Sequence, residues 1–113
     1  MSGPDSAAPA PGPELRVARS VIVQVARDAA LEVPEVLRIG RGGPAWRRFL
    51  GGPPIAVRVR ESVVDVRVWL IARPGSDLVA TADRVRATVG AAMERLLGLS
   101  LGTVTVVVDG VGG

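Results

Sequence analysis

Residues 55–73 read IAVRVRESVVDVRVWLIAR, and this stretch decides the fold. Apolar side chains occupy every second position from 55 to 59 and again from 64 to 72. A period of two predicts two strands, and the polar step Glu61-Ser62 between them predicts a hairpin. Because the strands alternate instead of being apolar throughout, we expect the sheet to bury one face only.

Helical patterns flank this hairpin. Upstream, the short segment Leu15–Ala18 is a candidate strand, and Ser20 is a candidate N-cap for a helix that starts at Val21 and ends near Pro34. Its apolar stripe is Val21, Ile22, Val25, Ala26, Ala29 and Val33. Downstream, Ser76 or Asp77 is expected to cap a second helix. Its stripe is Leu78, Ala82, Val85, Val89, Ala92, Met93 and Leu96. Gly98 suits the C-terminus of this helix, and alternating valines at 104, 106 and 108 predict a last strand.

The order strand, helix, strand, strand, helix, strand predicts an α+β fold. Each helix has one apolar stripe and each strand one apolar face, so we expect a two-layer sandwich with both helices on one side of a mostly antiparallel sheet. The 113 residues, 48% hydrophobic and 22% charged, suit one globular domain over residues 14–111. Residues 1–13, MSGPDSAAPAPGP, predict a disordered tail, and 35–54 a long Gly/Pro-rich connection.

The side chains needed for common catalytic chemistry are scarce. The chain has no histidine, cysteine, tyrosine or lysine, so we expect neither an enzyme nor a metal or other cofactor. Gly40-Arg41-Gly42-Gly43 is not followed by Lys-Ser/Thr and is a poor phosphate loop. The carboxylate pairs Glu32 with Glu35 and Glu61 with Asp65 are interpreted as solvated helix-end and turn residues.

The charge is segregated along the chain. All fourteen basic residues are arginine and the net charge is +3, yet residues 36–60 contain six arginines and no acid. The rest of the chain is therefore net negative. The sequence shows neither a signal-peptide pattern nor a long apolar run, which predicts a cytoplasmic location.

A partner-binding or self-association face is expected on the side of the sheet away from the helices. Its candidate residues are Trp69, Ile71, Arg58, Arg60, Arg67 and Val107. An aromatic residue framed by arginines is typical of protein interfaces. In the alternative interpretation, Trp69 only shields its cross-strand neighbours on a solvated face.

The connecting loop holds a second candidate contact. Within it, residues 45–50 allow at most one or two helical turns, and Trp46, Arg47, Arg48, Phe49 and Leu50 mix bulky apolar with cationic groups. This composition suits anionic lipid headgroups or an acidic partner. Alternatively, Trp46 and Phe49 fold back over the edge of the core while the arginines are solvated.

The segment Val21–Pro34, VIVQVARDAALEVP, resembles the opening helix of the bacterial alkaline shock protein family, which ends in an acidic residue, Val and Pro. The hairpin from Val57 to Gly75 is similar in spacing, and so are the C-terminal positions Val85, Val89, Leu96, Gly98-Leu99, Val104, Val106, Val108 and Gly110. The sequence departs from the family at Glu35, where a glycine is usual, and at Pro74, where an aromatic is common.

The resemblance implies a non-enzymatic protein of the envelope stress response. Members of this family self-associate and gather at the inner face of the cell membrane through a membrane-anchored partner, with roles in cell-envelope homeostasis. We therefore expect a homo-oligomer that docks on such a partner.

The alternative function is single-stranded nucleic-acid binding by the Arg/Trp face of the sheet, with Arg58, Arg60, Arg67 and Trp69 as the platform. Trp69 is the one aromatic expected on that face, Asp65 stands among the arginines, and no RNA-binding motif is present. Nucleic acid is therefore the less favoured partner.

Overall fold

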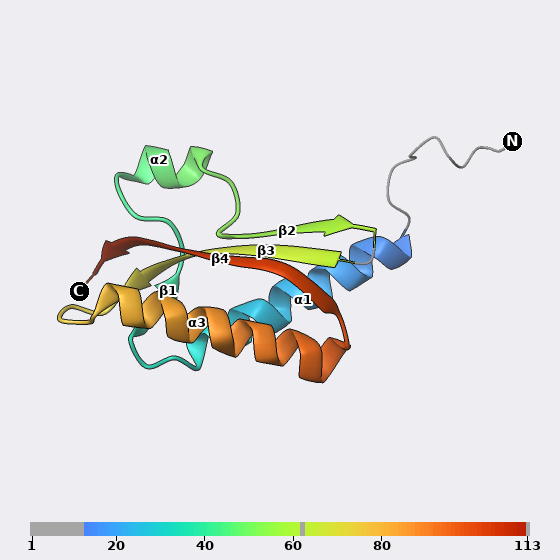
Figure 1. The fold of residues 1–113 in the computed structure, drawn as a ribbon. Coiled ribbons are helices and arrows are strands. Elements are labelled where there is room, and N and C mark those ends of the chain that lie inside the picture. The colour runs from blue at the N-terminus through green and yellow to red at the C-terminus, as the bar shows by residue number, and fades with distance from the viewer. Residues whose placement is uncertain (1–12, 62, 113) are drawn as a thin grey trace, which may run out of the picture.

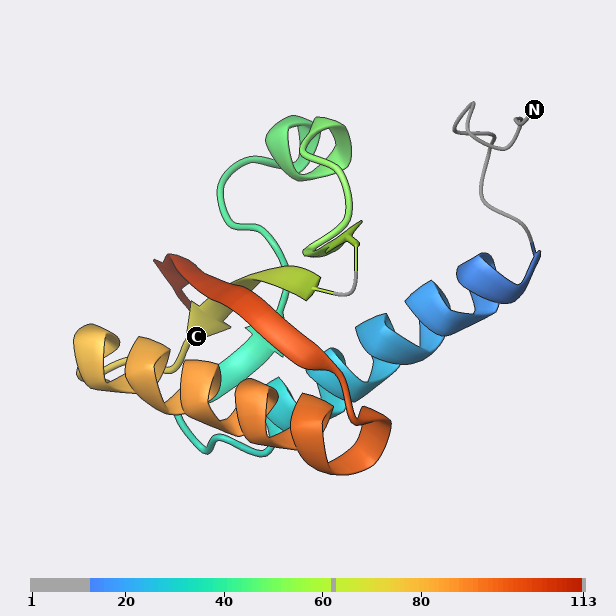
Figure 2. The same ribbon diagram turned by 45° about the vertical axis from the view of Figure 1, so that its right-hand side comes forward.

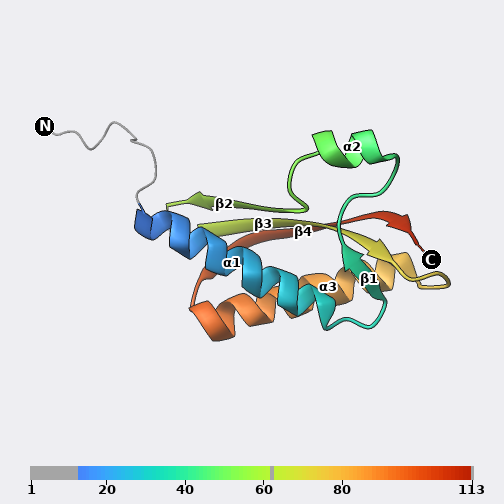
Figure 3. The same cartoon turned by 180° about the vertical axis from the view of Figure 1, so that it is seen from behind.

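The computed structural model describes residues 13–61 and 63–112 of the chain. In order, its elements are α1 (Pro13–Leu31), β1 (Val36–Ile39), α2 (Ala45–Leu50), β2 (Ile55–Arg60), β3 (Val63–Ala72), α3 (Leu78–Ala92), the π-helical turn η2 (Met93–Leu97) and β4 (Ser100–Val111). The helices α1 and α3 lie together under one face of the sheet, whereas α2 stands on the opposite side (Figures 1 and 3). The predicted two-layer α+β sandwich is confirmed.

Strand β3 is the centre of the sheet. Strand β4 pairs with it in parallel along its whole length, from Val63 to Ala72. Strands β1 and β2 pair with it antiparallel, at residues 70–72 and 63–68 respectively. Because β4 occupies one edge of β3, β1 and β2 must follow each other along the other edge. They are two halves of one edge strand, separated by residues 40–54, which we term the excursion.

The core lies between the sheet and the two long helices. Every second residue of β3 from Val64 to Leu70 is buried against them, with Val68 and Leu70 fully inaccessible. The helices contribute Ile22, Ala26 and Ala29 from α1 and Val85, Val89 and Ala92 from α3, and Val33, just after the end of α1, is buried with them. Small alanines on α1 allow a close approach to the sheet. The predicted stripes are confirmed at these positions, while Val21, Leu78 and Leu96 are exposed.

The predicted strand at Leu15–Ala18 is wrong, and so is the N-cap at Ser20. Both segments belong to α1, which begins at Pro13. Proline is favoured at the first position of a helix and Glu14 suits the first turn. The spacing of Leu15, Ala18 and Ile22 also continues the helical stripe upstream.

One strand was not predicted, because β1 lies within residues 35–54, which were expected to form a connection. Its four residues, VLRI, are too few for a period to stand out. Residues 1–12 of the predicted tail and Ser62 of the predicted turn lie outside the described residues. The hairpin between β2 and β3 is confirmed by its register, with Arg60 opposite Val63, and Glu61 has a left-handed φ of 56°.

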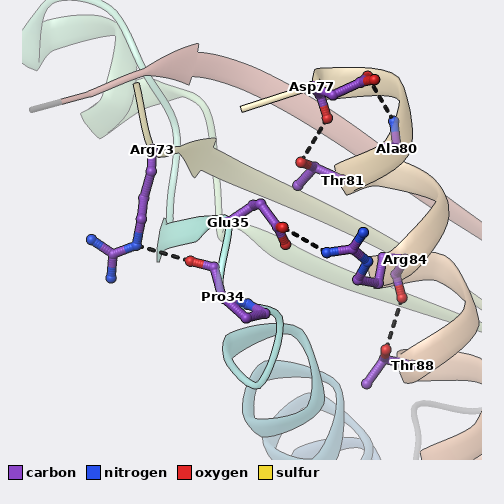
Figure 4. Close-up of polar contacts among 8 residues, drawn as sticks. All are labelled: Pro34, Glu35, Arg73, Asp77, Ala80, Thr81, Arg84 and Thr88. Atoms are coloured by element: carbon purple, nitrogen blue, oxygen red, sulfur yellow. Dashed lines mark hydrogen bonds and ion pairs between the residues drawn. The ribbon is translucent and has the colours of Figure 1, made fainter. Parts of the chain in front are cut away.

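The start of α3 and the end of η2, which continues it, follow the predicted signals. Asp77 is the N-cap, and its carboxylate accepts a hydrogen bond from Ala80 N at 3.1 Å, as Figure 4 shows. Gly98 follows η2 with a φ of 64°, the left-handed conformation that glycine adopts without strain. From there the chain turns directly into β4.

Candidate interaction face of the sheet

The candidate site is a shallow groove across the sheet face that the helices leave uncovered. It spans β2, β3 and β4 and has a volume of about 460 Å³. Its lining consists of Ala56, Val57, Arg58, Asp65, Val66, Arg67, Thr103 and Thr105. We term it the outer groove. Strand alternation places these polar side chains together, because their apolar neighbours point toward the helices.

Two arginines of the outer groove carry unpaired charge. Arg58 lies opposite Asp65 and Arg67 opposite Ala56, so the two are diagonal neighbours on one face of the hairpin. Both are exposed. Neither forms an ion pair with any residue that the structure describes. The outer groove thus presents two guanidinium groups to an incoming ligand.

The carboxylate of Asp65 has a structural role within the groove. It accepts a hydrogen bond from Arg60 Nε at 2.9 Å and another from the backbone N–H of Thr103 at 2.9 Å. The second bond holds a bulge in β4, where the register with β3 shifts between residues 64 and 66. A Cβ at Gly102 would lie 2.3 Å from Asp65 Oδ1, so a larger residue there would require the Asp65 side chain to move. The ion pair of Asp65 is with Arg60, and the described residues show none between Asp65 and Arg58 or Arg67.

Trp69, the predicted anchor, lies beside the groove and is half-buried. Both ends of the excursion meet its backbone: Gly40 N donates to Trp69 O at 3.0 Å, and Trp69 N donates to Pro54 O at 2.8 Å. The guanidinium of Arg41 lies 3.9 Å from the ring centroid, and that of Arg67 lies at 5.6 Å. Two cations therefore contact the indole, and Arg41 covers it closely.

The prediction that Ile71 is an exposed contact residue is wrong, because its side chain is only 3% exposed. The excursion and the end of β4 pass close to it: a Cβ added at Gly42 or at Gly110 would lie 3.4 Å from Ile71 Cδ1. Gly42 N also donates to Asp109 Oδ2 at 2.7 Å. Val107, opposite Trp69 on β4, is partly exposed and borders the covered region. Of the predicted face, the end formed by Arg58, Arg60 and Arg67 is exposed, Trp69 and Val107 are partly exposed, and Ile71 is buried.

The second predicted contact falls on α2, which projects above the sheet (Figure 1). Trp46 is 67% exposed and Leu50 73%, so neither folds back over the core. Four residues apart, they lie on the same side of a helical turn. The side chains of Arg47, Arg48 and Phe49 lie outside the described part of the chain. An exposed Trp–Leu pair is a candidate contact for a partner or a lipid surface.

Sequence reasoning missed the polar contacts at the corner between α1 and β1 (Figure 4). Arg84 Nη1 of α3 donates to Glu35 Oε2 at 2.6 Å, and Arg73 Nε donates to Pro34 O at 2.9 Å. The hydrogen bond from Arg84 is the main reason that the pKa of Glu35 lies below its ordinary value. Nothing in the sequence relates Glu35 to a partner 49 positions away. The Arg84–Glu35 pair thus connects α3 to the start of β1.

Within residues 13–61 and 63–112, no group of three His, Cys, Asp or Glu side chains is arranged to hold a metal ion. None of the helices in that part of the chain has the length and apolarity required to cross a membrane.

No protein-family model and no curated protein matches this sequence. Among solved structures, the fold is similar to the zinc form of a MamM CTD variant, with a TM-score of 0.57 and 13% sequence identity. The match covers 86% of this chain and 90% of that one. At this identity the likeness concerns the fold alone, and it agrees with the α+β arrangement described above.

Proposed function

We propose that this protein is a non-enzymatic scaffold of the alkaline shock type, which self-associates and docks on a membrane-anchored partner in the cytoplasm. The resemblance of Val21–Pro34 and of the hairpin spacing to that family motivates the cell-envelope role. The structure supports the partner-binding part, because one face of the sheet is left open and carries a groove.

The observation that carries the proposal is the charge of Arg58 and Arg67 in the outer groove, which no acid in the described part of the chain pairs. Exposed guanidinium groups that lack an intramolecular acid attract acidic surfaces and steer their approach. Each exposed Arg–carboxylate contact contributes about 0.2–1 kcal/mol. We therefore propose an acidic segment of the partner as the ligand of the groove.

The alternative, single-stranded nucleic acid, is less well supported by the same geometry. Base stacking requires an accessible aromatic ring, and Arg41 lies 3.9 Å from the centroid of Trp69. A bound nucleic acid would then be held by phosphate contacts to Arg58 and Arg67, without base stacking on Trp69. We retain this alternative only as an outcome of the test below.

Helix α2 is proposed as an auxiliary contact. Trp46 and Leu50 supply the apolar side of such a contact, and the arginines between them suit anionic lipid headgroups at the inner face of the membrane. This contact would add to docking on the protein partner.

Affinity capture from the native cells in mild detergent tests the proposal. Wild type is compared with the double variant Arg58→Ala/Arg67→Ala and with Arg27→Ala/Arg95→Ala, which removes the same charge from the helical layer. We expect a membrane protein to be recovered with wild type and with the control, and lost with the groove variant. Recovery of RNA with salt-sensitive retention would favour the alternative. Equal recovery by all three proteins would reject the groove as the docking site.

Self-association is measured separately by light scattering at micromolar concentration. We expect wild-type masses above that of the 11.7 kDa monomer, rising with concentration. A monomeric mass throughout this range would reject self-association.

A further inference from the structure

Strand β4 has an open edge. It runs over twelve residues, Ser100–Val111, and pairs with β3 along one side. In the described part of the chain, no strand pairs with its other side, and β4 lies at the margin of the sheet (Figure 2). An unpaired edge presents a row of backbone N–H and C=O groups that can bind another strand.

The hydrogen bonds of α3 identify which peptide groups of β4 face outward. Arg86 Nε on α3 donates to Val104 O at 3.2 Å, so this carbonyl is directed toward a side chain outside the sheet. Peptide groups alternate along a strand, so those of Val106 and Val108 face the same open side. The peptide groups of Thr105 and Val107, which lie opposite Arg67 and Trp69, face β3. Arg86 thus protects the start of the open edge and leaves Val106 and Val108 accessible.

The composition of β4 offers little protection against pairing. Its sequence, SLGTVTVVVDGV, has one charged residue, Asp109, and this carboxylate binds Gly42 N. Charged residues are the usual means by which an edge strand avoids another chain. Val104, Val106 and Val108 are also only partly buried, whereas Val66, Val68 and Leu70 on β3 are at most 1% exposed. An apolar row therefore accompanies the open backbone.

The opposite edge of the sheet is different. Strand β2 has six residues, two of them arginines, and Arg19 Nη1 of α1 donates to its Val57 carbonyl at 2.9 Å. The excursion separates β2 from β1, so that edge is short, cationic and interrupted. Pairing of β4 with β2 of another copy is therefore unfavourable, because β4 is long and nearly uncharged whereas β2 is short and basic. A second β4 matches both the length and the neutrality of the first.

We propose that β4 is the self-association edge, and that two copies of this chain pair their β4 strands antiparallel around a two-fold axis near Val106–Val108. The two sheets then form one continuous sheet, and the interface is isologous. The occupant is a second copy because both partners then satisfy identical hydrogen-bonding groups and join their partly exposed valine rows. This inference deepens the proposed self-association and rests on it.

Amide hydrogen exchange tests the pairing at the level of single residues. As the protein concentration rises through the range in which light scattering shows association, we expect exchange at Val106 and Val108 to slow by about ten-fold or more. The amides of Thr105 and Val107, already bonded to β3, should not change. Association without slower exchange at Val106 and Val108 would overturn the β4 interface and leave the scaffold proposal standing. A monomer at all concentrations would reject both.

A pair of variants provides an independent test. Val106→Pro removes the outward N–H and is compatible with an edge strand, whereas Val106→Ala shortens the side chain and keeps the N–H. We expect the proline variant to be monomeric and the alanine variant to associate as wild type does. Equal association of two folded variants would contradict the proposal. If the proline variant does not fold, the exchange experiment on wild type still decides the question.

Discussion

The guanidinium carbon of Arg41 lies 3.9 Å from the centre of the Trp69 ring, which joins the excursion to the central strand. Trp69 also holds both ends of that excursion through its backbone, with Gly40 on one side and Pro54 on the other. One residue of β3 therefore anchors a segment of fifteen positions, 40–54, by two backbone hydrogen bonds and a cation–π contact. The same contact covers part of the indole, which is half-buried.

Removing the Arg41 side chain should expose Trp69. In a Trp46→Phe background, Trp69 is the remaining tryptophan, so its fluorescence reports on this site. We expect Arg41→Ala to increase quenching by acrylamide and to lower the free energy of unfolding by about 0.5–1 kcal/mol, the usual size of an exposed cation–π contact. Arg38→Ala, which removes the same charge from neighbouring β1, is the control and should leave quenching unchanged. Equal quenching in both variants would show that Arg41 does not cover the ring.

Gly42→Ala should destabilise the protein. A Cβ at this position would lie 2.4 Å from the backbone oxygen of Asp109, so either the excursion or the end of β4 must move. We expect a loss of about 1–3 kcal/mol in denaturant unfolding, the range of overpacking substitutions.

The matched control for that change is Gly90→Ala in α3. There, an added Cβ would lie 3.5 Å from Leu101 Cδ1, an ordinary contact, and alanine is the better helix former. We expect a gain of up to about 1 kcal/mol. A destabilised Gly90→Ala together with a neutral Gly42→Ala would contradict the packing described for both sites.

Asp65→Ala should weaken the bulge of β4. The substitution leaves the N–H of Thr103 without its acceptor and frees Arg60. We expect a loss of about 1–2 kcal/mol of stability, with faster amide exchange at Thr103. Asp28→Ala, on the exposed side of α1, is a control that removes an acid without touching the sheet. Unchanged exchange at Thr103 would argue against the carboxylate as its acceptor.

Glu35→Gln should lower stability in a pH-dependent way. The pKa of Glu35 is depressed in the folded protein, chiefly by the hydrogen bond from Arg84, so the folded state favours the carboxylate. The stability that the Glu35 carboxylate contributes is fully present at pH values above the ordinary pKa of glutamate, and it is lost as the pH falls through the depressed pKa. We therefore expect the variant to be less stable than wild type at pH 7, with the difference vanishing in acid.

Chemical denaturation at a series of pH values measures this effect. Glu32→Gln, three residues earlier and exposed, is the control. A stability difference between wild type and Glu35→Gln that persists unchanged into acid would contradict the ion pair with Arg84 as its cause.

Much of the fold was predictable because local patterns carried it. The alternation over Ile55–Ala72 gave both strands and the face that each buries, and Asp77 and Gly98 marked the ends of the second long helix. The predictions for two four-residue segments were wrong. The segment Leu15–Ala18 is helical, and β1 has too few residues for a period. Such short segments take their structure from what they pack against.

The candidate site was only partly predictable. Alternation along the strands placed Arg58 and Arg67 on the open face, as the structure has them. It could not indicate that Arg41 covers Trp69 or that Ile71 is buried, because both depend on where the excursion turns. Neither could it relate Asp65 to Thr103, or Glu35 to Arg84. These contacts join residues far apart in the chain.

The sequence by itself determined the α+β class, the buried face of each strand and the absence of histidine and cysteine, since periodicity and composition are local properties of the chain. The tertiary structure decided that β1 and β2 share one edge of β3 and that the outer edge of β4 has no paired strand in the described part of the chain. It also decided that the carboxylates of Asp65 and Asp109 accept hydrogen bonds from backbone N–H groups. The physical reason is that hydrogen bonds between distant strands depend on register and bulges. A bulge of one residue redirects every following side chain and leaves only a faint trace in the sequence.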